Sequence, residues 1–179
     1  MTISFEFSPF GLQAAKCYRL RLPGFPMETL ISLAATGGYI GYIPLAPGTF
    51  GSLEGLLLGW LVFAPIMHRS PATAVALFAL LFAGACWIAG RAERIFAQHD
   101  SSRIVIDEIL GMAAATFLLP ARWPWMLAAF GLFRLFDILK PYPASLIDRQ
   151  LRGGIGVMLD DLAAAIYANL ILQAALRLL

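Results

Sequence analysis

The chain has 179 residues, of which 60% are hydrophobic and only 13% are charged. An average soluble domain carries about 25% charged residues and about 45–50% apolar ones, so this composition excludes an ordinary soluble globule. Disorder is excluded too, because it requires low hydrophobicity and high charge. The formal net charge of +2 is too small to indicate a nucleic-acid partner. The composition therefore predicts a small integral membrane protein of one domain.

The first third of the chain is mixed in composition and then irregular. Residues 1–28 contain three basic side chains followed by two prolines and a glycine, which predicts a basic N-terminal arm before a single membrane-embedded domain at residues 29–179. Residues 29–53 carry no charge but are rich in glycine and proline, so one regular spanning helix is not expected. We expect a short helix leading into a buried or re-entrant loop, because irregular backbone at membrane depth must be protected by protein.

Five apolar segments follow and are predicted to be membrane-embedded helices: residues 53–67, 72–90, 104–119, 123–139 and 159–176. The segments at residues 104–119 and 123–139 are short for a bilayer, since 1.5 Å of rise per residue gives each about 25 Å. Asp160 and Asp161 are expected to open the last helix, where carboxylates favour the positive end of the helix dipole. The predicted fold is all-α, with about five embedded helices plus the irregular Gly/Pro-rich segment.

Carboxylates are placed unusually in these segments. In an up-and-down bundle, five of them from three helices fall on one side of the membrane: Asp107, Glu108, Asp137, Asp160 and Asp161. An ionised side chain near the bilayer centre costs about 2.5–3.5 kcal/mol on insertion scales, so such residues usually mark a site. A single acid, Asp160 for example, can instead cap a helix or pair with an arginine. Adjacent acid pairs, however, repel one another unless a cation lies among them.

The ligand chemistry favours Mg²⁺, which binds through carboxylates and phosphate oxygens. A transition-metal centre is poorly supported, because His68 and His99 are the only histidines and His68 falls on the opposite side. Anion-binding groups lie nearby: Arg134 and Lys140 flank Asp137, and glycines 153, 154 and 156 are expected to expose backbone N–H groups before the last helix. A divalent cation beside a phosphate cradle at headgroup level predicts phosphoryl chemistry on a lipid.

The orientation follows from the basic residues. Seven fall on the acidic side, namely Arg91, Arg94, Arg103, Arg134, Lys140, Arg149 and Arg152. Three fall on the other side, namely Arg69, Arg122 and Arg177. By the positive-inside rule, the acidic side is predicted to face the cytoplasm.

Four stretches carry a resemblance to a known family. They are GYIPLAPGTFGS at 41–52, IDEILGM at 106–112, FRLFDILKP at 133–141, and DR at 148–149 followed by GGIGVMLDD at 153–161. In order and spacing these resemble the motifs of the phosphatidylglycerophosphatase A family. The resemblance implies a Mg²⁺-dependent, all-α phosphatase of the bacterial cytoplasmic membrane that converts phosphatidylglycerol phosphate to phosphatidylglycerol and inorganic phosphate.

The resemblance marks nine residues: Thr49, Asp107, Glu108, Arg134, Asp137, Lys140, Asp148, Asp160 and Asp161. Chemical reasoning assigns Asp107, Glu108, Asp137 and Asp161 to the metal. It assigns Arg134 and Lys140 to the phosphate, together with Thr49 and Gly154, while a helix cap is the alternative for Thr49. Asp160 is assigned as general base or further ligand. Glu54 and residues 1–28 lie outside the shared motifs, so Glu54 is expected to be interfacial.

Two other classes of protein compete with a phosphatase. A cation transporter or channel subunit also uses intramembrane acids, but it predicts acids spread in depth along a pore. A non-catalytic lipid-binding or assembly subunit needs no adjacent acid pairs. The residue pattern is compatible with one metal ion or two, with attack by water or through a phospho-aspartate, with activity on related phosphomonoesters, and with any oligomeric state.

Overall fold

The computed structural model describes residues 26–98, 101–142, 144–151 and 153–178. This part of the chain is helical and contains no strand. The α-helices are α1 (Pro26–Ala35), α2 (Pro47–Leu58), α3 (Ala64–Arg69), α4 (Pro71–Phe96), α5 (Ile106–Ala115), α6 (Trp123–Leu139), α7 (Ala144–Gln150) and α8 (Gly154–Leu178). A 3₁₀ turn lies at Ile40–Tyr42 and a π-helical segment at Gly59–Phe63. The predicted all-α fold is confirmed.

Among the described residues, three helices are long and apolar enough to cross a membrane: Pro47–Arg69, which joins α2, the π-helical segment and α3, then α4 and α8. The first two are separated where Ser70 adopts an extended conformation and caps α4, with Pro71 at the first helical position. Helix α6 has the predicted bounds and 17 residues. The predicted span at 104–119 is wrong in length, because α5 has only 10 residues and ends in turns, with Leu118 at a positive φ of 60°.

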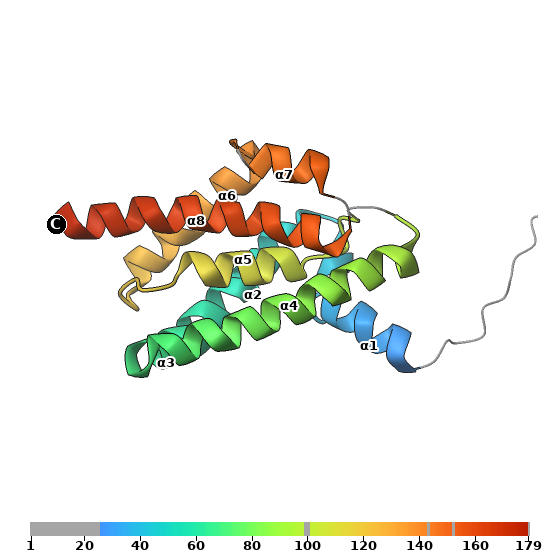
Figure 1. Cartoon of the computed structure of the whole chain (residues 1–179), viewed down its shortest axis with the longest axis horizontal. Coiled ribbons are helices and arrows are strands. Elements are labelled where there is room, and N and C mark those ends of the chain that lie inside the picture. Colours follow the sequence, from blue (N-terminus) through green and yellow to red (C-terminus); the bar gives the residue numbers. More distant parts are fainter. Residues whose placement is uncertain (1–25, 99–100, 143, 152, 179) are drawn as a thin grey trace, which may run out of the picture.

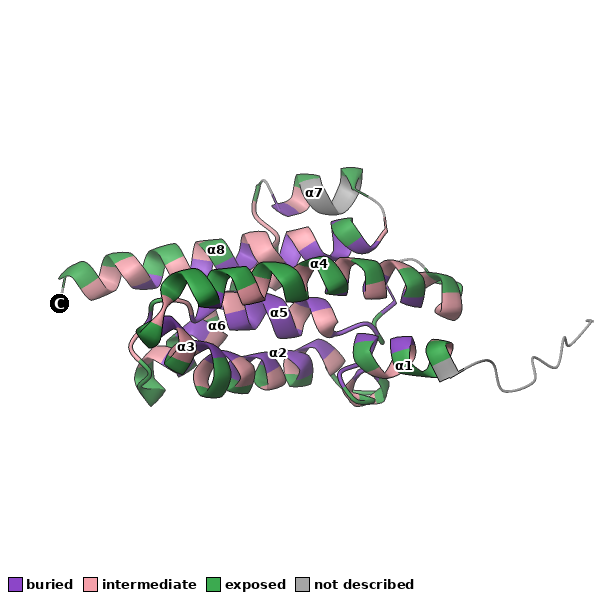
Figure 2. Cartoon of the chain, turned by 60° about the horizontal axis from the view of Figure 1, so that its bottom comes forward, coloured by how far each residue is buried: buried purple, intermediate pink, exposed green. Residues whose placement is uncertain are grey.

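Helix α5 lies at the centre of the bundle. It packs against α2, α4, α6 and α8, and Figure 1 shows it between the long antiparallel α4 and α8. Most of its residues are buried, as the purple ribbon in Figure 2 shows. A Cβ on Gly55 of α2 would lie 2.3 Å from the carbonyl oxygen of Ile109, so glycine is required for this close approach. Small residues at helix contacts of this kind are typical of membrane bundles.

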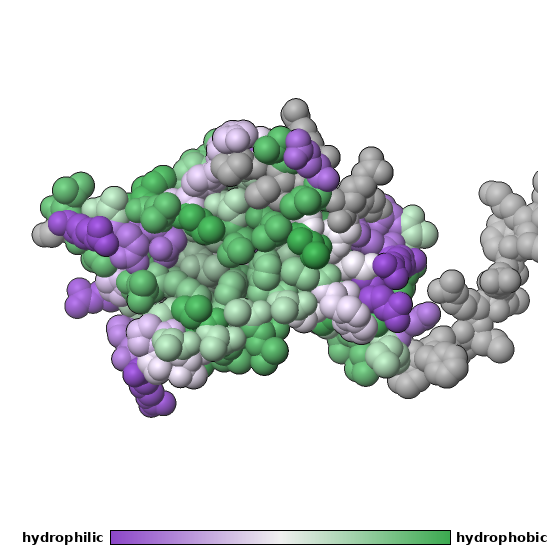
Figure 3. Space-filling model, viewed as in Figure 1, coloured by the Kyte–Doolittle hydropathy of each residue, from purple (hydrophilic) through white to green (hydrophobic). Residues whose placement is uncertain are grey.

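The outer surface is apolar around the middle of the bundle and polar at its two ends. Figure 3 shows a hydrophobic belt between hydrophilic ends. Large side chains in this belt point outward, including Leu61, Leu80 and Leu170, which are 61–71% exposed. Exposed apolar surface of this extent on all three spanning helices is what a lipid-facing surface requires. The protein is therefore a membrane protein.

The predicted start of the last helix is wrong. Helix α8 begins at Gly154, after Gly153 at a φ of +82°, so Asp160 and Asp161 lie nearly two turns inside the helix. Their carboxylates therefore do not occupy the N-terminal turn, where the free N–H groups of a helix are found. The helix dipole therefore does not explain why these two acids are present, and this favours a role for them in a site.

The irregular segment begins as predicted, with a short helix. Helix α1 ends at Ala35, and Gly37, Gly38 and Tyr39 then adopt positive φ values. Tyr39 and Tyr42 are exposed, with their tilted rings 5.9 Å apart between centroids, so the loop lies partly on the surface. Its re-entrant depth remains a prediction. Of the predicted N-terminal arm, residues 26–28 belong to α1, and the rest lies outside the described residues.

Candidate active site

Three predicted metal ligands meet at one end of the bundle. Asp107 and Glu108 lie in the first turn of α5, and Asp161 lies on the facing side of α8. One oxygen from each carboxylate lies within 4.8 Å of the other two. A Cβ on Gly111 would lie 3.1 Å from the Cβ of Asp161, which shows how closely α5 and α8 approach below the acids. The structure thus brings Asp161 into one cluster with two adjacent carboxylates that lie 53 or more positions earlier in the sequence.

The cluster is buried and incompletely satisfied. Asp107 and Asp161 are 7% and 4% exposed. Asp107 Oδ1, Glu108 Oε2 and Asp161 Oδ2 are buried without a hydrogen-bond partner in the described part of the chain. Leaving a buried polar atom unpaired costs about 1–3 kcal/mol, and more when it is charged. Oxygen ligands without partners, held this close together, fit a divalent cation of the hard, oxygen-binding kind.

The pKa values of the two acids in α5 also favour a bound cation. Helix α5 is too short to span the membrane. Burial raises the pKa of Asp107 well above its usual value, and repulsion from the adjacent Glu108 raises it further. Burial also raises the pKa of Glu108. The ionised carboxylates are therefore costly on their own, and a positive ion among them removes that cost.

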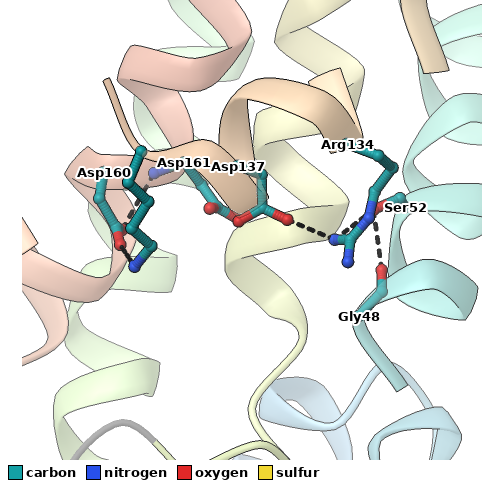
Figure 4. A network of polar contacts seen from close by, with 7 residues as sticks. Gly48, Ser52, Arg134, Asp137, Asp160 and Asp161 are labelled. Carbon is teal, nitrogen blue, oxygen red and sulfur yellow. Dashed lines mark hydrogen bonds and ion pairs between the residues drawn. The ribbon is translucent and has the colours of Figure 1, made fainter. Parts of the chain in front are cut away.

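Asp137 connects this cluster to the positively charged side chain of Arg134. It lies at the end of α6, and Figure 4 shows its carboxylate directed toward that of Asp161. Its Oδ2 accepts a hydrogen bond from Nη1 of Arg134 at 2.5 Å. Asp137 therefore joins the carboxylate cluster to the predicted phosphate-binding arginine.

Ser52 is a site residue that the sequence analysis did not single out. It is fully buried, and its hydroxyl accepts a hydrogen bond from Arg134 Nη1 at 3.3 Å while donating to the Gly48 carbonyl at 2.8 Å (Figure 4). The serine fixes the guanidinium relative to the first turn of α2. Its place at the end of the 41–52 motif was the available signal, but serine in an apolar helix commonly bonds only its own backbone.

Replacing Gly48 by alanine is expected to disrupt the cluster through Glu108. An added Cβ at Gly48 would lie 2.3 Å from Glu108 Oε1 and 3.3 Å from Arg134 Nη1. A misplacement of about 1 Å in a catalytic group costs about a hundredfold in rate, so we expect that loss of kcat with the fold retained. Gly84→Ala, at a glycine with nothing near its added Cβ, is the control for kcat and melting temperature. Equal kcat in the two variants would contradict this role of Gly48.

Asp160 faces a different partner from its neighbour. Lys140 Nζ lies 2.5 Å from Asp160 Oδ2, and Asp160 Oδ1 accepts from the Asp161 backbone N–H at 3.0 Å. Lys140 ends α6 in a left-handed conformation, which turns its side chain toward α8. Asp160 is therefore held outside the three-carboxylate cluster, in an ion pair.

Three further predicted residues have other surroundings. Thr49 is the third residue of α2, whose cap is Ala46, so the helix-capping alternative is wrong. Gly154 lies within α8, not before it, and an added Cβ would lie 2.1 Å from the Cys86 carbonyl oxygen; close packing on α4 thus accounts for this glycine. Asp148 belongs to α7, but its side chain lies outside the described residues.

Taken together, the fold and the cluster define a helical membrane protein with a cation-binding carboxylate centre at one end of the bundle, beside an arginine and a lysine. The described acids of the cluster gather at one level, so a transporter with acids spread along a pore is not favoured. The pattern of the family described as Phosphatidylglycerophosphatase A matches residues 33–176. The chain belongs to the phosphatidylglycerophosphatase A family and is an enzyme, a phosphatase.

Three similar proteins agree on phosphatase chemistry. "Phosphatidylglycerophosphatase A" of Haemophilus influenzae is 40% identical over 80% of this chain and 87% of the relative. The protein of that name from Escherichia coli is 34% identical over 76% and 77%. A Bacteroides thetaiotaomicron protein, provisionally named as a phosphatidylinositol-3-phosphatase, is 36% identical over 80% and 91%. No solved structure matches the chain significantly.

Proposed function

We propose that this protein hydrolyses phosphatidylglycerol phosphate to phosphatidylglycerol and inorganic phosphate, with Mg²⁺ as cofactor. One observation carries the proposal: three carboxylates with buried, unpartnered oxygens lie next to an arginine that is already fixed by two hydrogen bonds. The family and the names of two relatives support the choice of substrate. Mg²⁺ in proteins is commonly bound by carboxylates together with phosphate oxygens of the substrate, and a phosphomonoester at a lipid headgroup provides those phosphate oxygens.

In this proposal the carboxylates of Asp107, Glu108 and Asp161 hold the ion, with Asp137 beside them. When bound, Mg²⁺ neutralises phosphate charge and favours ionisation of the attacking water. Arg134 binds the phosphoryl oxygens through its remaining N–H groups, which suit a tetrahedral anion. Ser52 and Asp137 keep that guanidinium in place, so its orientation is set before the substrate binds.

Asp160 is assigned as general base. An ionised carboxylate can accept the proton of the attacking water, and the 2.5 Å ion pair with Lys140 fixes the position of Asp160. Lys140 also contributes positive charge near the phosphate. Thr49 and the adjacent backbone of α2 remain proposed contacts of the substrate, since they lie one turn from Ser52.

We further propose that the site faces the cytoplasm of a bacterial inner membrane. The described basic residues at the site end of the spans are Arg91, Arg94, Arg103, Arg134 and Lys140. Those at the opposite end are Arg69, Arg122 and Arg177. An excess of basic residues on the site side supports this orientation.

Phosphate release by the purified full-length protein in detergent micelles tests the activity. With phosphatidylglycerol phosphate and Mg²⁺ we expect turnover, which excess chelator abolishes and added Mg²⁺ restores. Phosphatidic acid and phosphatidylinositol-3-phosphate, presented in the same micelles, test headgroup selectivity. Turnover that is unchanged by the chelator would overturn the metal requirement, and a preference for either comparison lipid would overturn the substrate assignment.

A further inference from the structure

A hollow with charged side chains lies away from the carboxylate cluster, between α1 and α4. It has a volume of about 240 Å³. Its lining consists of Met27, Glu28, Ile31, Arg91, Arg94 and Ile95. None of these residues belongs to the candidate active site.

The hollow lies at the level of the membrane interface. Gly90 of α4 packs against Gly154, the first residue of α8, so Arg91 and Arg94 lie at the same end of the bundle as the cluster. Arg91 stacks over the ring of Trp87, with 5.6 Å from its Cζ to the ring centroid. Trp87 is 55% exposed, and exposed tryptophans beside arginines mark the headgroup level of a bilayer.

The chemistry of the hollow is amphipathic. Two guanidinium groups and one carboxylate line it, which leaves one net positive charge. Apolar side chains complete the lining, namely the exposed Met27, the half-buried Ile95 and the buried Ile31. A guanidinium binds phosphate oxygens through paired N–H groups, and an apolar wall suits the glycerol backbone and the first methylenes of an acyl chain.

A simpler role for the arginines does not account for this shape. Arginines that only set the orientation of a membrane protein need no concave surface between two helices. A site for free phosphate has no use for an apolar wall. A phospholipid whose headgroup carries a net negative charge uses both features.

We propose that the hollow between α1 and α4 binds the headgroup of an anionic phospholipid, at a site separate from catalysis. The lipid phosphate contacts Arg91 and Arg94, and the glycerol region lies against Met27 and Ile95. The binding needs neither the metal centre nor turnover, so it can be tested whether or not the proposed phosphatase reaction is correct.

Quenching of Trp87 fluorescence by brominated lipids provides the test. In the full-length protein, Trp60, Trp123 and Trp125 are replaced by phenylalanine, and the protein is reconstituted in phosphatidylcholine vesicles. Dibrominated phosphatidylglycerol, added as a minor component, is expected to quench Trp87 well beyond its bulk fraction. Dibrominated phosphatidylcholine in the same amount is expected to quench only in proportion to its fraction. Equal quenching by the two lipids would overturn the proposal.

Charge variants identify the site. Arg91→Gln with Arg94→Gln is expected to weaken the preference for the anionic lipid roughly twenty-five-fold, because each basic residue near an anionic lipid contributes about a factor of five. Arg69→Gln with Arg122→Gln, at the opposite end of the bundle, should leave the preference unchanged. A preference that survives the first pair or is lost in the second would refute the site. Displacement of the lipid by millimolar inorganic phosphate would show an anion site and overturn the lipid assignment.

Discussion

Asp161→Asn is expected to lower kcat at least about a thousandfold and, at the same time, to raise the thermal stability of the metal-free protein. A metal at a phosphoryl group contributes several kcal/mol to the transition state, and losing about 4 kcal/mol is a thousandfold in rate. The buried Oδ2 of Asp161 has no described hydrogen-bond partner and lies among other carboxylates. Neutralising it removes a repulsion that only a cation otherwise offsets.

Two measurements check this result. The rate of phosphate release gives kcat, and thermal unfolding is followed with Mg²⁺ and with chelator. In the unmodified protein Mg²⁺ is expected to raise the melting temperature, because a ligand that binds only the folded state stabilises it. That increase should vanish in Asp161→Asn. Asp107→Asn should behave in the same way, since it removes a second member of the cluster.

Glu54→Gln is the matched control. Glu54 also has an oxygen that is buried and has no partner among the described residues, but Glu54 lies on α2, close to Gly37 and outside the cluster. Its replacement should leave kcat and the effect of Mg²⁺ on melting nearly unchanged. If Asp107→Asn and Asp161→Asn retain near-normal kcat, or if Glu54→Gln abolishes the effect of Mg²⁺, the metal is misplaced in our proposal.

The sequence predicted the helical fold well because hydrophobic segments in a membrane have few alternatives. All five apolar segments contain a helix, and α6 has the predicted bounds. Helix α5 was mispredicted because an apolar run cannot distinguish a span from a buried helix. Its surroundings are protein on several sides, so the chain can leave the helix after Ala115 while the side chains of Thr116 and Leu119 stay buried.

The start of α8 was mispredicted for a different reason. Glycines 153, 154 and 156 indicate a loop by propensity, because each costs about 1 kcal/mol relative to alanine in a helix. At Gly154 tertiary packing overrides that cost, because an added Cβ would lie 2.1 Å from the Cys86 carbonyl oxygen of α4. At Gly156 the close neighbour is local, since an added Cβ would lie 2.1 Å from the Leu151 carbonyl oxygen. No local pattern reveals that the backbone of Gly154 faces α4.

The site carboxylates stand out in the sequence because the chain has so few charged residues. Only the structure shows that they form two groups, the three-carboxylate cluster and the Asp160–Lys140 ion pair. In the sequence, Asp160 and Asp161 are equivalent neighbours. In the helix they point about 100° apart, so Asp161 faces α5 and its acids while Asp160 faces Lys140. The link between Ser52 and Arg134, 82 positions apart, has no counterpart in local sequence at all.

Arg134→Lys is expected to reduce kcat/KM by a factor of about 10²–10³, which is the usual loss when one charge-stabilising donor is removed. Arg134 Nη1 alone makes two hydrogen bonds, to Asp137 Oδ2 and to Ser52 Oγ. The other N–H groups of the same planar fork therefore have a fixed direction. Lysine keeps the charge but has no such fork, so a loss in this variant reports geometry and not charge alone.

Ser52→Ala separates orientation from charge still further. It leaves Arg134 and its bond to Asp137 in place and removes one restraint on the guanidinium. We therefore expect a smaller loss of kcat/KM, about tenfold, and weaker competitive inhibition by inorganic phosphate. Arg122→Lys, at the opposite end of the bundle, controls for a general effect of the substitution. If Arg134→Lys keeps full kcat/KM, the guanidinium does not bind the reacting phosphate. If Ser52→Ala loses as much as Arg134→Lys, the serine does more than orient the arginine.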